Sequence, residues 1–249
     1  MNFYVGPHMS LIDFNYNLEN IITSVINMGG NCCQIYTSNT DTLSIKSKTL
    51  KLDNVQIENI KKMLKKNNFK LFIHLHLSLN LSNATKSPNK NLGIKNIFYD
   101  LEIGNKHGVS GYVIHLGYKK TTKYNISEEE AINNYVNNMK YIIDNFRGNY
   151  RILIETDVNL ENRIDGTIEG LGDIYDRFDN KYRKNIGICV DTAHIFAAGY
   201  DLRKINEVKK YFKNFDKFIG LKNLDLIHLN DSNAKFNSRL DRHTSLGKG

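Results

Sequence analysis

The stretch RILIETDVNLENRIDGTIEGLGDIYDRFDNKYRKNIGICVD, from Arg151 to Asp191, contains the pattern that predicts the fold. Its two ends, residues 151–155 and 186–191, are short runs rich in aliphatic and β-branched residues, and the amphipathic segment 168–178 lies between them. A strand, a helix and a second strand in this order indicate repeated βα units around a parallel sheet. The same alternation continues in both directions along the chain.

Seven short apolar runs are predicted as strands, and an amphipathic segment follows each of the first six. The predicted strands are residues 3–5, 32–36, 70–74, 111–115, 151–155, 186–191 and 224–230. The predicted helices are residues 18–28, 55–65, 94–107, 128–146, 168–178 and 205–218. Only two prolines occur, and no linker or repeat interrupts the series, so we expect one domain.

The number of βα units predicts the architecture. Seven units in one domain favour an α/β fold, namely a TIM-like (β/α)8 barrel, because a seven-stranded parallel sheet left open would expose an edge. The sequence ends at Gly249, shortly after the seventh predicted strand. We therefore expect a single TIM-like barrel domain over residues 1–249 that is C-terminally incomplete, with the eighth βα unit missing.

Composition narrows the class of protein. A chain of 249 residues with 41% hydrophobic residues can bury a full core. The formal net charge of +8 fits a polyanionic partner such as nucleic acid. Lysine and asparagine are abundant throughout the chain, however, so a general bias explains the charge equally well.

The cysteines and the N-terminus bear on the compartment. The chain has three cysteines, and the adjacent Cys32 and Cys33 cannot serve as a disulfide framework, which favours a reducing compartment. The N-terminal MNFYVGPH lacks the features of a signal peptide, and no apolar run approaches the ~20 residues of a membrane helix. We expect a soluble, intracellular monomer without a membrane partner.

Polar residues at the ends of successive predicted strands point to the chemistry. They are His74, His115, Glu155, Asp191 and His228. The carboxyl ends of the strands form the functional face of a TIM barrel, where side chains from different strands converge. A single histidine that ends a strand is usually structural, whereas five consecutive strands that end in imidazole or carboxylate favour a functional site.

Two pairs at short spacing add further ligand-type residues: Asp191 with His194, and Asp241 with His243. The total of eight exceeds what one metal ion needs, so we expect a multinuclear site, of the kind that clamps the attacking and leaving oxygens of a displaced phosphate. Imidazole and carboxylate without thiolate suit Zn²⁺ or Mn²⁺, and the preponderance of imidazole favours Zn²⁺.

The remaining histidines leave alternatives open. His74 and His76 lie two residues apart and would face the same side of a strand, so the pattern alone does not choose between them. His8 follows the first predicted strand, where a substrate contact and a structural role are equally consistent with its position. His107, near Gly108, is interpreted as a surface or C-cap residue, and Cys189 as a core residue.

Two long blocks resemble the endonuclease IV family of apurinic/apyrimidinic endonucleases: VDTAHIFAAGYDLR from Val190 and HLNDSNAKFNSRLDRHTSLGKG from His228. Weaker similarity in YVGPHMS, QIYTSN, VIHLG and ILIET extends over the whole chain. The resemblance implies an eight-stranded barrel with three zinc ions, with Mn²⁺ as the alternative at one site.

The resemblance also implies roles for particular residues. The family pattern has a metal-binding histidine six residues before an asparagine, which selects His74 relative to Asn80. Glu155 matches a carboxylate that bridges two metals and is the implied catalytic residue. The implied metal ligands are His74, His115, Glu155, Asp191, His194, His228, Asp241 and His243. Asn39 and Arg242 are the implied DNA-binding residues.

The activity implied by the resemblance is hydrolysis of the phosphodiester 5′ to an abasic site in double-stranded DNA by a zinc-bound hydroxide. The residues agree, since no serine, cysteine or threonine nucleophile motif is present and zinc lowers the pKa of bound water to about 7. No organic cofactor is needed. The implied protein is therefore a metal-dependent phosphodiesterase of DNA repair.

The chain departs from the family pattern at several positions. Asp41 and Leu77 match an arginine and a tyrosine that help to penetrate DNA, and the family's glutamate on strand eight has no counterpart before Gly249. Basic residues on loops could contact DNA in place of the arginine and tyrosine that this chain lacks. The candidates are Lys46, Lys48, Lys119 and Lys120.

Two other functions are consistent with parts of the pattern. A metal-dependent sugar isomerase or epimerase uses similar barrels with Glu, Asp and His at strand ends, because fold does not settle function. Such an enzyme needs fewer histidines and would leave His194, Asp241 and His243 without a role. A non-catalytic DNA-lesion-binding module is the second alternative, in which the metal sites persist without hydrolysis.

Overall fold

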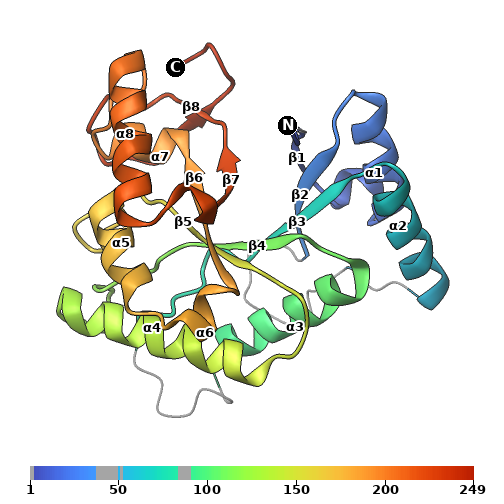
Figure 1. Cartoon of the computed structure of the whole chain (residues 1–249), viewed down its shortest axis with the longest axis horizontal. Coiled ribbons are helices and arrows are strands. Elements are labelled where there is room, and N and C mark those ends of the chain that lie inside the picture. The colour runs from blue at the N-terminus through green and yellow to red at the C-terminus, as the bar shows by residue number, and fades with distance from the viewer. Residues whose placement is uncertain (1–2, 38–49, 51–52, 84–90) are drawn as a thin grey trace. The chain divides into compact units, whose positions relative to one another are not determined.

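The computed structural model describes residues 3–37, 50, 53–83 and 91–249 (Figure 1). The chain forms two compact units, which are described separately. Unit 1 comprises Met1–Leu79, Asn89–Ile114 and Asn145–Arg151, and unit 2 comprises Asn80–Pro88, His115–Asp144 and Ile152–Gly249. Seven parallel strands occur in the described residues, four in unit 1 and three in unit 2.

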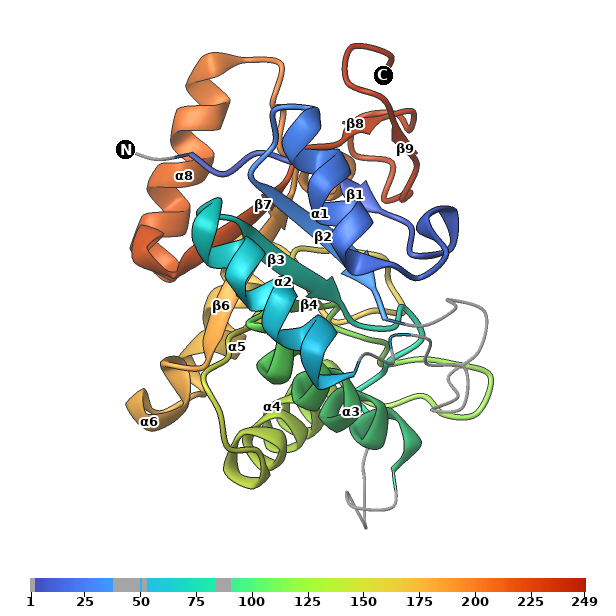
Figure 2. The same ribbon diagram turned by 90° about the vertical axis from the view of Figure 1, so that its right-hand side faces the viewer.

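Unit 1 contains a four-stranded parallel sheet with the strands in sequence order. The strands are β1 (His8–Met9), β2 (Cys32–Tyr36), β3 (Lys70–His74) and β4 (Gly111–Ile114). The helices are α1 (Leu18–Asn27), α2 (Asn54–Lys66) and α3 (Leu92–His107), with the short 3₁₀ helix η1 (Ile12–Phe14) before α1. Helices α1 and α2 lie side by side along the strands (Figure 2), and α2 also contacts α3.

Helix α1 shows how the sequence specifies these elements. The side chain of Asn17 accepts a hydrogen bond from the backbone N–H of Asn20 and so caps the N-terminus. One face of the helix is buried, at the spacing of a 3.6-residue period, by Leu18, Ile21, Ile22 and Val25. Each of these side chains contributes about 1.5–3 kcal/mol through removal from water. The sequence after the helix turns at Gly29, whose φ of 85° suits glycine.

Unit 2 contains a three-stranded parallel sheet and most of the helices. The strands are β5 (Ile152–Glu155), β6 (Ile186–Asp191) and β7 (Leu224–His228). The helices are α4 (Glu128–Asn145), α5 (Ile168–Asp176), α6 (Asn180–Arg183), α7 (Thr192–Ala197) and α8 (Ile205–Phe218), with η4 (Leu221–Asn223) before β7. A small antiparallel pair, β8 (Asp231–Ser232) and β9 (His243–Thr244), follows.

Strand β6 lies in the middle of the unit 2 sheet, and all six of its residues are buried. Its register places Cys189 beside Glu155 of β5, and Asp191 beside His228 of β7. Gly187 permits this packing, because a Cβ atom there would lie 1.8 Å from the Asp225 Oδ2 atom. The strand ends that carry the candidate ligands are therefore held at adjacent positions.

The first strand was predicted at residues 3–5, and this prediction is wrong. The structure has β1 at His8–Met9, while Phe3 and Val5 are 74% and 70% exposed. Val5 is instead held by Asn31, whose backbone N–H donates to the Val5 carbonyl and whose Oδ1 accepts from the Val5 N–H. The regular ladder starts after Pro7, which lacks an N–H group.

The structure also differs from the prediction at His107. His107 is buried at the end of α3, where its Nδ1 lies 2.5 Å from the Ile103 carbonyl oxygen and Gly108 is the C-cap residue, so a surface position for His107 is wrong. The pKa of His107 is lowered, chiefly because the ring is buried.

Helices α6 and α7 were not predicted, since four or six residues are too few to show helical periodicity.

Across the parts of the chain that the structure covers, no helix combines the length and the apolar character required to traverse a bilayer.

Candidate metal centre

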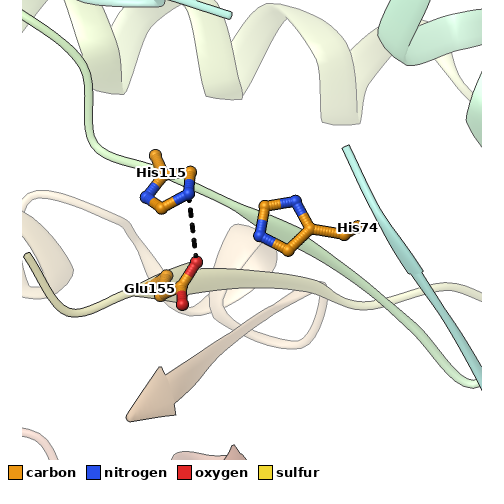
Figure 3. Close-up of side chains that lie close together, drawn as sticks. All are labelled: His74, His115 and Glu155. Carbon is orange, nitrogen blue, oxygen red and sulfur yellow. Dashed lines mark ion pairs between the residues drawn. The ribbon is translucent and has the colours of Figure 1, made fainter. Parts of the chain in front are cut away.

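Glu155, the last residue of β5, lies between two histidines. Its Oε1 is 2.7 Å from Nδ1 of His228, at the end of β7, and its Oε2 is 3.5 Å from Nε2 of His115, the residue after β4. Figure 3 shows the Glu155 carboxylate turned toward the His115 ring. The Glu155 side chain is only 2% exposed. A buried carboxylate with an imidazole at each oxygen has the arrangement expected of a group that bridges two cations.

Asp191 ends β6 and also caps helix α7. Its Oδ1 accepts hydrogen bonds from the backbone N–H groups of Ala193 and His194, at 2.8 and 3.1 Å. Its Oδ2 accepts from Nδ2 of Asn230 at 2.7 Å and lies 3.7 Å from His228 Nδ1. The helix N-terminus stabilises the negative charge of the carboxylate. One oxygen is thus held by the backbone, and the other faces the histidines.

His194 lies in the first turn of α7 and is oriented by Thr156, the residue that follows β5. Its Nδ1 donates a hydrogen bond to the backbone carbonyl of Thr156, at 2.8 Å, so Nε2 is the nitrogen that is left for a cation once its own proton is lost. That Nε2 lies 3.3 Å from Oδ2 of Asp241. Thr156 also positions Asp191, whose N–H donates to the Thr156 hydroxyl at 2.8 Å. A histidine that is held by a carbonyl through one nitrogen and faces a carboxylate with the other has the orientation of a typical metal ligand.

The pair Asp241 and His243 reaches the centre through the β8–β9 hairpin. His243 Nε2 is 3.0 Å from Oδ1 of Asp241 and 3.6 Å from Oδ2 of Asp191. The hairpin loop rests on α7, because the N–H of Arg239 donates to the Ala197 carbonyl at 2.9 Å. The structure therefore brings together the two short-spaced pairs that the sequence singled out.

The charges of these groups perturb one another. Burial opposes protonation of His194, but its hydrogen bond to Asp241 and the nearby carboxylates outweigh it and raise the pKa of His194 to about 10. Burial also opposes protonation of His228, but Glu155 and then Asp191 outweigh it and raise the pKa of His228. The pKa of His243 is raised mainly by its hydrogen bond to Asp241. Hydrogen bonds from His194 and His243 lower the pKa of Asp241. The carboxylates therefore attract positive charge into the centre.

The donor set fits divalent cations. Two groups of residues in unit 2 each offer three ligand atoms that lie within 4.8 Å of one another. The first group is Glu155, Cys189 and His228, and the second is Asp191, His194 and His243. Imidazole and carboxylate donors of this kind suit Zn²⁺. Cys189 was interpreted as a core residue, and it is fully buried. Burial, then Glu155 and Asp191, raise the pKa of its thiol, which makes it a poor ligand beside the carboxylates.

His74 belongs to unit 1, where it ends β3 and is buried. Its Nδ1 lies 2.7 Å from the Leu75 carbonyl oxygen, and its ring is 5.1 Å from that of Tyr36 and 6.3 Å from that of His8. His76 is buried too, with its Nδ1 accepting from the Ser78 N–H at 3.0 Å. His8 therefore lies next to His74 within unit 1. Figure 3 also draws His74.

The predicted DNA contacts have different outcomes. Asn39, Asp41, Lys46 and Lys48 lie outside the described residues. Arg242 is exposed on the hairpin, between Asp241 and His243. Lys120 is exposed, whereas Lys119 forms an ion pair with Glu128 at the start of α4. The positive charge of Lys119 is therefore already compensated within the chain.

Comparison with known proteins defines the family. A family model described as xylose isomerase-like TIM barrel matches residues 23–249. Two relatives are provisionally named endonuclease 4. The one from Clostridium beijerinckii is 30% identical over 98% of this chain and 83% of its own length. The one from Acanthamoeba polyphaga mimivirus is 34% identical over 76% of this chain, and the match spans only 61% of that relative.

A third relative and a solved structure agree with these matches. The apurinic-apyrimidinic endonuclease of Caenorhabditis elegans is 34% identical over 58% of this chain and 35% of its own length. The crystal structure of endonuclease IV from Thermus thermophilus has the same fold, with a TM-score of 0.77 and 19% identity over 98% of this chain and 83% of that one. The chain belongs to the xylose isomerase-like TIM barrel family and, within it, to the endonuclease IV family. The predicted α/β TIM-barrel fold and the family resemblance are thus confirmed.

Proposed function

We propose that this chain is a metal-dependent phosphodiesterase that cleaves DNA on the 5′ side of abasic sites. The observation that carries the proposal is the position of Glu155, with His115 and His228 at its two carboxylate oxygens, beside Asp191 and its own histidines. A family of endonucleases supplies the reaction class. The C. elegans relative, named as an apurinic-apyrimidinic endonuclease, supplies the substrate.

The proposed centre has three ions, each held by residues already described. Glu155 would be the catalytic carboxylate shared by two of the cations, with His115 and His228 at its two oxygens and Asp191 in the neighbouring strand. His74 is the further ligand that the family resemblance implies. His194, Asp241 and His243 would hold the remaining ion. Zn²⁺ is the expected metal, with Mn²⁺ as the alternative at one position. When bound, such ions activate water and neutralise the charge of the phosphate that is attacked.

The protein's own residues prepare this chemistry. The Thr156 carbonyl keeps the His194 proton on Nδ1, so that Nε2 is directed at Asp241. The α7 N–H groups hold Asp191 Oδ1, which leaves Oδ2 at the centre. Burial of Glu155 and Asp191 excludes bulk water from both carboxylates and strengthens their attraction for cations. Arg242, exposed next to two ligands, is proposed to contact a DNA phosphate.

The test is cleavage of an end-labelled duplex that carries one abasic analogue. The purified chain is incubated with added Zn²⁺, with a chelator, and as the Glu155→Ala variant. We expect cutting at the lesion only with metal and only in the unsubstituted chain. Glu161→Ala is the matched control, because Glu161 is an exposed carboxylate on the loop after β5 and should leave cleavage unchanged. Cleavage by Glu155→Ala at the normal rate would refute the mechanism.

Experiments on the same purified chain distinguish two other candidate functions. The family is described as a xylose isomerase-like TIM barrel, so a sugar isomerase or epimerase is the second candidate. The trio of His194, Asp241 and His243 argues against it, because one or two ions suffice for that chemistry. Metal-dependent conversion of a ketose without DNA cleavage would favour it. Metal-loaded protein that binds the lesion without cutting would instead indicate a non-catalytic lesion-binding module.

A further inference from the structure

Three side chains next to the metal centre form a contact that the proposed mechanism does not use. Arg163 Nη1 donates to Oδ2 of Asp157, and Nη2 donates to the Tyr118 hydroxyl at 2.8 Å. The Arg163 guanidinium carbon also lies 4.7 Å from the centre of the Tyr118 ring. Asp157 is fully buried, and the Arg163 side chain is 18% exposed. We call this set of three residues the loop clamp.

The loop clamp joins the two loops that begin with metal ligands. Tyr118 lies three residues after His115, and Asp157 lies two residues after Glu155. The backbones of the two loops are also paired at this point, since the N–H of Lys119 donates to the Asn162 carbonyl at 2.9 Å. The segments that lead away from His115 and Glu155 are therefore fixed to each other by side chains and by backbone.

The energetics of the loop clamp indicate that stability alone does not account for it. Asp157 Oδ1 and Arg163 Nε are both buried, and neither has a hydrogen-bond partner among the described residues. Each buried polar atom without a partner is unfavourable, and apolar residues of similar size often replace a buried ion pair without loss of stability. The planar guanidinium group has several donors in fixed positions, so an ion pair with it fixes the relative positions of the groups that it contacts.

We propose that the loop clamp is a positioning device that holds His115 and Glu155 at the distance a shared metal ion requires. The inference rests on the metal centre of the proposed function and not on its DNA substrate. Groups outside the ligand sphere that orient ligands typically change metal affinity by about 10–100-fold when they are removed. The metal affinity of this chain should therefore depend on three residues that bind no metal.

The experiment separates positioning from stability with two variants. Arg163→Met leaves Asp157 buried without its cation, and Asp157→Leu/Arg163→Met removes both charges. Zinc affinity is measured by competition with a chromophoric chelator, and the melting temperature is measured in the metal-free protein. We expect the single variant to lose both stability and at least tenfold in the affinity of one ion. The double variant should recover the melting temperature but keep the tenfold loss of zinc affinity.

Controls make the result decisive. Arg177→Met removes an arginine of similar exposure, 24%, whose partners Glu129 and Asp173 lie on helices, and it should leave zinc affinity unchanged. Asp157→Asn keeps the size and the acceptor for Arg163, so it should fold normally and show a smaller loss of affinity. It serves as the test if the double variant is unstable.

Two outcomes would contradict the inference. Wild-type zinc affinity in the double variant, or in Asp157→Asn, would show that the loop clamp does not position the ligands. A wild-type chain that takes up no zinc would overturn the metal centre and the loop clamp together. Zinc uptake that depends on the loop clamp, without any DNA cleavage, would support the inference while refuting the nuclease activity.

Discussion

The candidate metal centre has two halves with different structural support. Glu155, Asp191 and His228 end strands of the unit 2 sheet, and we call them the strand half. Asp241 and His243 stand on the β8–β9 hairpin, each with a side chain 42% exposed, and form the hairpin half. Glu155 and Asp191 are at most 2% exposed. The two carboxylates of the strand half are thus part of the core, whereas the hairpin half lies at the surface, and substitutions should affect the two halves differently.

The largest effect is expected in the strand half. Asp191→Ala removes the α7 cap and leaves the amide of Asn230 without its acceptor, so it should lower the free energy of unfolding by about 2–4 kcal/mol in addition to abolishing metal binding. Urea denaturation in the presence of chelator measures the change. Asp179→Ala is the control, since Asp179 precedes α6 without a side-chain capping bond and should change stability by less than about 0.5 kcal/mol. Equal effects of the two would contradict the comparison.

The second effect is a pH dependence that links the halves through His194 and Asp241. Because the pKa of His194 is raised to about 10 in the metal-free fold, its charged ring stabilises the protein below the unfolded pKa of about 6.5, and this stability is lost as pH rises toward 10. Zinc must displace that proton, so its affinity should rise by up to about tenfold per pH unit over the same window.

Two measurements between pH 6.5 and pH 10 check the expectation about His194. One is the melting temperature of the protein in the presence of a chelator, and the other is the zinc affinity measured by competition. His194→Gln should flatten the stability curve across that window. A melting temperature that rises with pH in the metal-free wild type would show the sign to be wrong.

A smaller effect on stability is expected in the hairpin half. Asp241→Ala removes a partly exposed carboxylate, so the free energy of unfolding of the metal-free protein should change by no more than about 1 kcal/mol. The zinc content should nevertheless fall by one ion per chain, as measured by metal analysis after gel filtration. Retention of the full zinc content would place Asp241 outside the centre.

The smallest effect concerns DNA and not metal. Arg242 is exposed on the hairpin, so Arg242→Ala should leave zinc content unchanged while weakening binding to DNA with and without a lesion alike. The slope of log affinity against log salt concentration should fall by about 1. Lys119→Ala is the comparison, because Lys119 is paired with Glu128 and should change the slope less. The reverse order would show that the β4 loop, and not the hairpin, grips the phosphate.

The same contrast explains what the sequence could predict. The ends of β3, β5 and β6 were placed correctly because each follows a continuous apolar run, and the buried polar residue at the end of the run marks the functional face. Helix α8 has the predicted bounds, Ile205–Phe218, because fourteen amphipathic residues show their period clearly. Long, periodic elements are therefore visible in the sequence alone.

Other parts of the site depend on contacts that no local pattern encodes. The Thr156 carbonyl that orients His194 is 38 residues away in sequence, and any residue could supply it. The hairpin has strands of only two residues, too short for alternation to be recognised. No local pattern marks Asp157 and Arg163 as an ion pair, and only the fold shows that Asp157 is buried. The short spacing and the family resemblance predicted Asp241 and His243 as ligands, and the structure shows which contacts support them.

Asp191 has a consequence for attempts to change the metal that the protein uses. One carboxylate ends a strand, starts a helix and faces the histidines of the proposed metal centre, so an engineer who exchanges it for another donor also removes the start of α7. Asp241 and His243 do not cap a helix in this way. Directed evolution toward a different ion should therefore accumulate substitutions around Asp241 and His243 and leave Asp191 untouched.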